Sequence, residues 1–400
     1  MKSQDGSGGR LTSIDALRGF DMFWIIGGEE IAIQLCRRLD SSSHSESVFG
    51  WLARFIASLE PQFHHATWHG FRFYDLIYPL FLFLVGVVLP FSLAKYGEGP
   101  SPGAYGRVVR RTLSLILLGF IYAGFLQFPF MTIDSAGVHF DWSKTRIPGV
   151  LQRIGVCYFF AAIIVMNSRP LVQTIIVALI LAGYHAIFAF VPGGAGAAGD
   201  FSVENNLAGW LDRQVFGGSK MYYGGDNEFP KFGDNEGVLS TLPAVATTLI
   251  GALAGSWLRS GVSPIVKTAV LAIVGAVLVE GGWLWEKFGG FPVNKMLWSS
   301  SYVLVAGGWS LILLSAFYFI IDVCGIRFWA YFFVVIGANA ITAYVIRHFI
   351  DFDYSAKFFF GGVMKLSNNQ DAALILHVGV VALLWLVLWF FYRHRVFFRV

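Results

Sequence analysis

Long apolar runs are the feature of this sequence that most constrains its fold. They recur along the whole chain of 400 residues, and many approach the roughly 20 residues that a helix needs to cross a bilayer. Only 14% of the residues are charged, against about 25% in an ordinary soluble domain. The sequence therefore predicts an all-α membrane protein, a bundle of about ten transmembrane helices in a single domain over residues 1–400.

The ends of the apolar runs carry prolines, glycines and basic residues, which favour helix boundaries. The expected spans lie near residues 14–35, 73–94, 108–128, 148–166, 171–191, 239–258, 264–281, 300–321, 328–349 and 372–392.

The connections between the spans differ in charge, and this difference predicts the orientation. One set is short and basic, with turns around Arg169, Arg259 and Arg327. Because Lys and Arg in short connections favour the cytoplasmic side, both termini are predicted to be cytoplasmic. The first residues lack the apolar core of a signal peptide, so the first span is expected to stay in the membrane. The longest outward connection, 192–238, is either a solvated loop or a lid over a polar site.

Ionisable residues inside a span are functional candidates, because burying them in lipid is expensive. The first predicted span contains Asp15, Arg18, Asp21, Glu29 and Glu30. Asp15 and Arg18 are spaced to pair near the cytoplasmic end, and such a pair anchors the helix or contacts a ligand. Glu29 follows two glycines that allow close approach, and a desolvated carboxyl there would suit proton transfer.

Three of the nine histidines, His64, His65 and His69, fall within six residues before the second predicted span, and Asp75 follows them. Such a cluster could coordinate zinc, but no cysteine joins it, and adjacent histidines on a regular helix do not point at one ion. A neutral imidazole that acts as base or nucleophile, oriented by a carboxylate, fits at least as well. The chain's cysteines, Cys36, Cys157 and Cys324, are widely separated, so neither a disulfide framework nor a metal site is expected.

Two further polar stretches enter later spans. Arg146 and Arg153 flank the start of the fourth predicted span, and Arg153 inside it needs an anionic partner such as Glu29 or a ligand phosphate. Asn339 lies in the ninth predicted span among small residues, where it could join helices by a hydrogen bond.

Several motifs, taken together and in order, resemble the heparan-α-glucosaminide N-acetyltransferase family, including its bacterial members. They are Leu11-Thr-Ser-Ile-Asp15-Ala-Leu-Arg18-Gly19, His65-Ala-Thr-Trp68-His69-Gly70 with Asp75-Leu-Ile-Tyr-Pro79, Arg146-Ile-Pro-Gly-Val-Leu-Gln-Arg153, Glu236-Gly-Val-Leu-Ser-Thr, and Pro292-Val-Asn294-Lys295 through Trp298.

The resemblance implies acetyl transfer from cytoplasmic acetyl-CoA, as co-substrate and with no metal, to the amine of a terminal glucosamine on the outer side. The family's catalytic histidine corresponds to His65, which would act as base or acetyl carrier. The lysosomal enzyme has an asparagine late in its corresponding helix, where this chain has Glu29. That enzyme also has an extra N-terminal region and helix, so the shorter chain resembles its bacterial relatives.

From the motifs and the buried charges we assign expected roles. His65 and Glu29 are the predicted catalytic residues. The predicted acceptor contacts are Trp68, His69, Asp75, Asn294, Lys295, Trp298 and Asn339. The predicted acetyl-CoA contacts are Asp15, Arg18, Asp21, Arg146 and Arg153, with the basic group Arg107, Arg110 and Arg111 as further phosphate candidates or as ordinary cytoplasmic anchors.

Two other functions remain open at this point. Buried charges also suit a proton-coupled sugar transporter, although no inverted repeat is detectable. An O-acyltransferase acting on another envelope glycan would share the chemistry and differ in the acceptor. In each case we expect a bacterial inner-membrane protein with the His65 loop facing outward, no nucleic-acid partner, and a homodimer as one plausible assembly.

Overall fold

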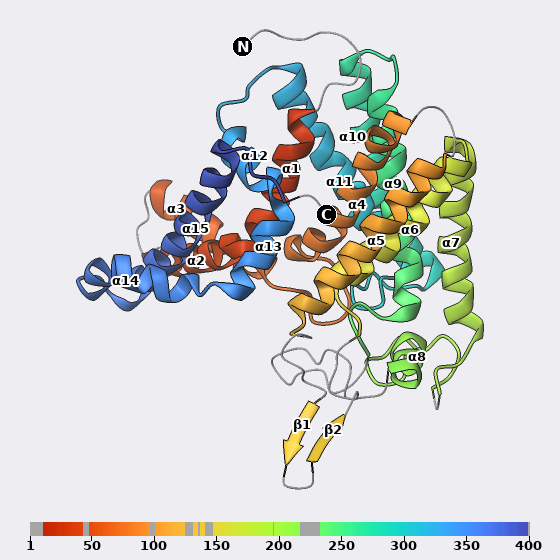
Figure 1. Cartoon of the computed structure of the whole chain (residues 1–400), viewed down its shortest axis with the longest axis horizontal. Helices are drawn as coiled ribbons and strands as arrows, with labels where there is room; N and C mark the ends of the chain where they lie inside the picture. Colours follow the sequence, from red (N-terminus) through yellow and green to blue (C-terminus); the bar gives the residue numbers. More distant parts are fainter. Residues whose placement is uncertain are drawn as a thin grey trace.

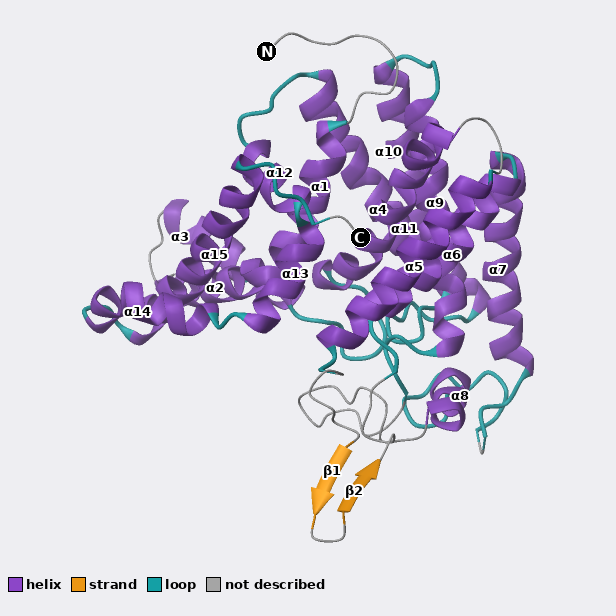
Figure 2. Cartoon of the chain, viewed as in Figure 1, coloured by secondary structure: helices purple, strands orange, loops and turns teal. Residues whose placement is uncertain are grey.

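The computed structural model describes residues 11–42, 48–96, 101–124, 131–134, 137–140, 147–194, 196–216 and 233–398. Helices account for nearly all of its regular structure (Figure 2). The α-helices are α1 (Thr12–Phe23), α2 (Glu29–Ser42), α3 (Val48–Ala57), α4 (Ile77–Leu93), α5 (Pro102–Tyr122), α6 (Val150–Asn167), α7 (Pro170–Phe190), α8 (Leu207–Phe216), α9 (Val238–Arg259), α10 (Pro264–Gly289), α11 (Ser300–Phe317), α12 (Ala330–Ala338), α13 (Ala340–Phe349), α14 (Phe352–Lys365) and α15 (Asn369–Arg393).

A short antiparallel hairpin, β1 (Met131–Asp134) and β2 (Gly137–Phe140), projects from one end of the bundle, on the same side as α8 (Figure 1). The sequence did not predict this hairpin or the short helices α3, α8 and α14. These segments are too short to span a bilayer, so the search for apolar runs of that length passes over them.

The central helices are α4 and α9, which pack against each other, while α7, α10 and α15 are the least buried of the long apolar helices. Of these peripheral helices, α7 is seen at one edge of the bundle (Figure 1). The peripheral helices expose large apolar side chains, including Leu179 on α7 and Ile273 on α10. A helix that is apolar on both its buried and its exposed faces is typical of a membrane span. The chain is therefore an integral membrane protein.

Within the described ranges, seven helices are long and apolar enough to cross a membrane, and the α12–α13 pair, bent by 70°, makes eight if it counts as one span. These eight coincide with predicted spans, so the all-helical class is confirmed, with seven or eight spans supported rather than about ten. The first part of the predicted span 108–128 lies in α5, whose three arginines exclude this helix from the set, and residues 125–128 lie outside the described ranges.

The predicted span 14–35 is broken. A π-helical turn, Trp24–Gly28, separates α1 from α2, and Gly27 in it has φ 139°. This backbone conformation is accessible to glycine and strained for other residues. The sequence interpretation took the glycines as a place of close approach, and a Cβ atom on Gly27 would lie only 2.8 Å from Cγ2 of Val381 on α15. Gly27 also marks the point where the helix changes direction and leads into Glu29.

Close contact between helices depends on small residues. A Cβ atom on Gly337 of α12 would lie 2.0 Å from the backbone oxygen of Asp15 on α1, and one on Gly86 of α4 would lie 1.9 Å from that of Thr248 on α9. Backbones that approach this closely are a common basis of helix packing in membranes. The helices that carry the site are thus held against their neighbours with little room to shift.

Candidate active site

The centre of the site is a histidine paired with a buried carboxylate. Nδ1 of His65 lies 2.8 Å from Oδ1 of Asp75, whose side chain is 1% exposed, whereas the His65 side chain is 49% exposed. Asp75 sits in the short helical turn Phe73–Leu76 that leads into α4. The fold thus presents an open imidazole on a carboxylate fixed within the protein.

Local sequence explains why Asp75 is held firmly. Its Oδ2 accepts hydrogen bonds from the backbone N–H of Ala66 at 3.1 Å and of Arg72 at 3.0 Å. The second bond closes the start of the helical turn, as acidic residues near helix N-termini often do. The hydroxyl of Tyr302 on α11 also donates to the backbone oxygen of Asp75, at 2.7 Å. An ionised Asp75 accepts from Nδ1–H, so the lone pair of the neutral His65 ring is on Nε2.

A lysine from a distant segment completes the group. Nζ of Lys295, in the connection between α10 and α11, lies 3.0 Å from Nδ1 and 3.2 Å from Nε2 of His65, and 3.7 Å from Oδ1 of Asp75. An atom nearly equidistant from both ring nitrogens lies against the ring rather than along the lone pair of either one. Lys295 is held there because the N–H of Gly70 donates to the backbone oxygen of Val293 at 2.8 Å.

The charges around His65 act on its pKa in opposite directions. Partial burial and the nearby ammonium of Lys295 lower the pKa of His65, and they outweigh the carboxylate of Asp75, which raises it. Burial also lowers the pKa of Lys295, against the opposing effect of Asp75, Glu236 and Glu29. The imidazole is therefore neutral at neutral pH and available as a base or nucleophile.

Glu29 reaches this group through an intermediate residue. Its carboxylate is hydrogen-bonded to the side chain of Tyr74, and the Tyr74 ring lies 4.7 Å from the ring of His65, centroid to centroid. The sequence interpretation paired Glu29 with His65 and gave Asp75 to the acceptor. In the structure, Asp75 makes the direct contact with His65.

The three clustered histidines do not converge. His65 faces Asp75, His64 lies 3.7 Å from Glu60, and the ring of His69 lies beside that of Trp68. In the described part of the chain, no three or more His, Cys, Asp or Glu residues gather as a metal site would require.

Several predicted acceptor contacts lie in the two loops that carry His65 and Lys295. Trp298 is 1% exposed, has a left-handed backbone with φ 51°, and donates from its indole N–H to Thr247 at 3.1 Å. Asn294 accepts from the N–H of Leu297 at 2.8 Å and shapes the loop around Lys295. Trp68 donates to the backbone oxygen of Phe201 at 2.8 Å, which links the His65 loop to the connection between α7 and α8.

Other predicted residues lie apart from the His65–Asp75 pair. Asn339 stands at the break between α12 and α13 and donates to the backbone oxygen of Val396 at 3.3 Å. Arg18 donates to Asp15 at 2.7 Å and to the backbone oxygen of Gly337 at 2.7 Å, where α1 meets α12. Asp21 is fully buried in α1, with both carboxylate oxygens unpartnered among the described residues.

The remaining predicted acetyl-CoA contacts are not gathered in one place. Arg153 is buried between α6 and α9, where it donates to Ser240 and, at 3.3 Å, to the backbone oxygen of Gly237. Its guanidinium lies 5.0 Å from the ring centre of Trp298. Arg146 lies outside the described residues. Of the basic group on α5, Arg111 covers the ring of Tyr158 at 4.6 Å, and Arg107 donates to Tyr96 at 3.3 Å.

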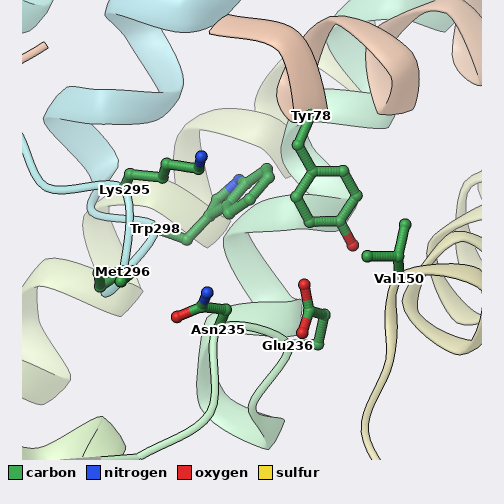
Figure 3. Close-up of a pocket in the computed structure, with 7 residues that line it drawn as sticks. All are labelled: Tyr78, Val150, Asn235, Glu236, Lys295, Met296 and Trp298. Atoms are coloured by element: carbon green, nitrogen blue, oxygen red, sulfur yellow. The ribbon is translucent and has the colours of Figure 1, made fainter. Parts of the chain in front are cut away.

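A cavity of about 190 Å³ opens beside Lys295 (Figure 3). It is lined by Tyr78, Val150, Asn235, Glu236, Lys295, Met296 and Trp298. Tyr74, Tyr302 and Glu236 are members of the site to which the sequence analysis gave no role. The sequence did contain an indication that Glu236 belongs to the site, because Glu236 is the first residue of one of the motifs that resemble the family.

The fold and site define a polytopic membrane protein with a His–Asp–Lys centre at the ends of its helices. Comparison with protein-family models gives no match. The chain is 29% identical over 389 residues to human heparan-alpha-glucosaminide N-acetyltransferase and 26% identical over 388 residues to the mouse protein of that name. Each alignment covers 84% of this chain and 56% of the relative, so the chain spans about half the length of the curated relatives it matches. The chain is thus a distant homologue of the heparan-alpha-glucosaminide N-acetyltransferases, and the resemblance read from the motifs is confirmed at that level.

Proposed function

We propose that this protein is a membrane acetyltransferase that moves an acetyl group from acetyl-CoA to the amine of a glucosamine-type sugar. The observation that carries the proposal is the contact of 2.8 Å between His65 and the buried Asp75, in a distant homologue of N-acetyltransferases. The carboxylate holds the imidazole in the tautomer with its lone pair on Nε2. Lys295 lies against the ring, so a substrate can approach Nε2 in the ring plane.

In the direct route, Nε2 of His65 takes a proton from the acceptor amine as the amine nitrogen attacks the carbonyl carbon of the thioester. The new C–N bond forms, the C–S bond breaks, and the CoA thiolate receives the proton from the imidazolium. The products are the N-acetylated sugar and CoA. Asp75 stabilises the imidazolium that forms in between.

In the covalent route, Nε2 attacks the thioester first, CoA leaves with a proton, and the amine then attacks the acetyl-imidazole and releases His65. In both routes the carbonyl oxygen becomes negative in the transition state. The ammonium of Lys295, 3.2 Å from Nε2, is placed to stabilise that charge. Rapid acid quench with labelled acetyl-CoA separates the routes, because only the covalent one leaves label on the enzyme.

The orientation is part of the proposal. We place both termini in the cytoplasm and the His65 loop on the outer side, so that acetyl-CoA from the cytoplasm reaches His65 through the bundle, with its long acyl arm extended. Asp15, Arg18, Asp21, Arg146 and Arg153 stay the proposed donor contacts, and the connection 192–238 stays a proposed lid. The charge pattern of the connections supports this arrangement.

The test is acetyl-CoA consumption by the purified protein in detergent with a panel of amino sugars and glycans. An enzyme needs no sealed compartment, whereas a transporter does. We expect CoA release that depends on an amino sugar, loss of at least about 100-fold in His65→Ala, and little change in the control His64→Ala. CoA release by His65→Ala at the wild-type rate would refute the catalytic role of His65. If the wild-type protein releases no CoA with any acceptor, the proposed acetyltransferase function is wrong.

A further inference from the structure

The cavity beside Lys295 is small and built from several segments. Tyr78 comes from α4, Glu236 from the turn before α9, and Lys295 and Trp298 from the connection between α10 and α11 (Figure 3). Its volume of about 190 Å³ is below the roughly 300–1,000 Å³ of sites for drug-sized ligands. It therefore has room for one small ring and not for a nucleotide.

Glu236 is held at this cavity by its backbone. Its N–H donates to Asp234 at 2.9 Å, and buried Asp212 on α8 accepts from the N–H of Asp234 at 3.2 Å and of Val238 at 2.9 Å. Arg153 fixes the next residue, since it donates to the backbone oxygen of Gly237 at 3.3 Å. The turn that carries Glu236 is thus anchored on both sides, and Figure 3 shows its carboxylate pointing toward the hydroxyl of Tyr78.

One lining residue has a buried polar group without a partner among the described residues, the hydroxyl of Tyr78. Nδ2 of Asn294, and Nε and Nη1 of Arg153, are also unpartnered there, but they lie behind the lining residues, Arg153 over the Trp298 ring. A buried donor left without an acceptor costs about 1–3 kcal/mol. The Tyr78 hydroxyl at this small cavity points to a polar ligand that supplies its missing partner.

The cavity also has opposite charges on its two sides. Lys295 faces the cavity and touches His65, while Glu236 faces it from the turn before α9. A neutral sugar can give a carboxylate at this position only hydroxyl hydrogen bonds, whereas an ammonium group on a sugar ring adds a charge–charge attraction. Tyr78 and Trp298 pack edge to face, with ring centres 5.2 Å apart, and together form one aromatic wall for the sugar ring.

We propose that Glu236 binds the ammonium group of an amino-sugar acceptor in this cavity and so selects amines over hydroxyls. The proposal rests on the proposed acetyltransferase function and names its acceptor contact. Glu236 acts in binding. The bound ammonium gives one proton to solvent to become the amine, and His65 takes the second proton as that amine attacks the thioester. The Glu236 side chain contacts the charged amine, which glucosamine has and glucose lacks, and which acetylation converts to a neutral amide.

The experiment measures binding without acetyl-CoA, so that it does not depend on turnover. Glucosamine, glucose and N-acetylglucosamine are titrated onto the full-length protein in detergent, with saturation-transfer NMR as the readout. We expect glucosamine to bind at least about tenfold more tightly than the other two. In Glu236→Gln that preference should vanish while glucose affinity stays, and the control Glu204→Gln on the outer connection should behave as wild type.

Equal binding of the three sugars by the wild-type protein would overturn the inference whether or not the variant folds. A Glu236→Gln protein that binds glucose normally and keeps the glucosamine preference would overturn it as well. If the protein prefers glucosamine but transfers no acetyl group, only the proposed function is refuted. If it transfers acetyl groups but does not prefer glucosamine, only the role of Glu236 is refuted.

Discussion

Nζ of Lys295 lies 3.0 Å from Nδ1 of His65, although 230 positions of the sequence separate the two residues. The His65 loop precedes α4, and the Lys295 loop joins α10 to α11. The hydrogen bond from Gly70 to the backbone oxygen of Val293 connects the two loops directly. The reactive imidazole and its neighbouring cation are therefore brought together by tertiary structure and not by local sequence.

Replacing Lys295 by Met should shift the pH dependence of the reaction. Burial and the ammonium of Lys295 lower the pKa of His65, so removing the ammonium raises that pKa. A base must be unprotonated to act, so the acidic limb of kcat/KM moves to higher pH in Lys295→Met, and in the wild type it lies below about 6.5. The measurement is a pH profile of kcat/KM, with Lys287→Met on α10 as the control. An unmoved acidic limb would show that Lys295 does not act on His65.

Replacing Asp75 by Asn should lower kcat by about 10²–10⁴-fold. The amide can donate to Nδ1, which places the proton of the ring on Nε2, the atom that must react. The measurement is the rate of CoA release at saturating substrates, with Asp353→Asn on α14 as the control. Thermal unfolding should accompany it, because Asp75 also accepts from two backbone N–H groups. Turnover within a few-fold of wild type in a folded Asp75→Asn protein would contradict this role.

Replacing Glu29 by Gln should reduce turnover less than the change at Asp75. Glu29 contacts Tyr74 and not His65 directly, and a hydrogen bond to a charged group is worth about 1.5–3 kcal/mol, or about 10–100-fold in rate. Tyr74→Phe removes the same bond from the other side and should give a similar fall. The two single variants and the double variant form a cycle. If their effects simply add, the two side chains do not act together.

Replacing Gly337 by Ala should destabilise the protein, since the new Cβ would lie 2.0 Å from the backbone oxygen of Asp15. Overpacking of this kind costs about 1–3 kcal/mol or more. Gly361→Ala on α14 is the matched control, because no described residue beyond its own stretch of helix lies within 4 Å of the added Cβ and alanine favours a helix by about 0.5–1 kcal/mol. The midpoint of thermal unfolding in detergent should fall for the first variant and hold or rise for the second. A fall of equal size in both would refute the packing argument.

Much of the membrane architecture was predictable from sequence because a span is a local property. The predicted spans at 73–94 and 239–258 coincide with α4 and α9, since a run of apolar residues is sufficient to identify them. The break of the first span was not predictable in this way. Gly27 is compatible with a continuous apolar run, and only the backbone shows that the chain turns there.

In the candidate site, too, the features set by local sequence were predictable and those set by tertiary structure were not. The clustering of histidines before Asp75 is visible in the sequence, and His65 and Asp75 do meet. Their partner Lys295 was given to the acceptor because no spacing rule relates positions 65 and 295. Trp68 was also given to the acceptor. Its indole N–H bonds to the backbone of Phe201, a contact that the sequence does not show, and its contact with an acceptor stays a prediction.

The left-handed backbone of Trp298 has a consequence for how this cavity can change. A side chain other than glycine in that conformation carries about 1–3 kcal/mol of strain. Glycine would relieve the strain but remove the ring that covers Arg153 and forms a wall of the cavity. Any other aromatic residue would keep the wall and the strain but lose the indole N–H that Thr247 receives. At residue 298, relief of backbone strain favours glycine, whereas the shape of the cavity favours an aromatic side chain. Variants at this position should therefore fall into two groups. One group folds without the strain and accepts different sugars, and the other keeps the strain and the original acceptor.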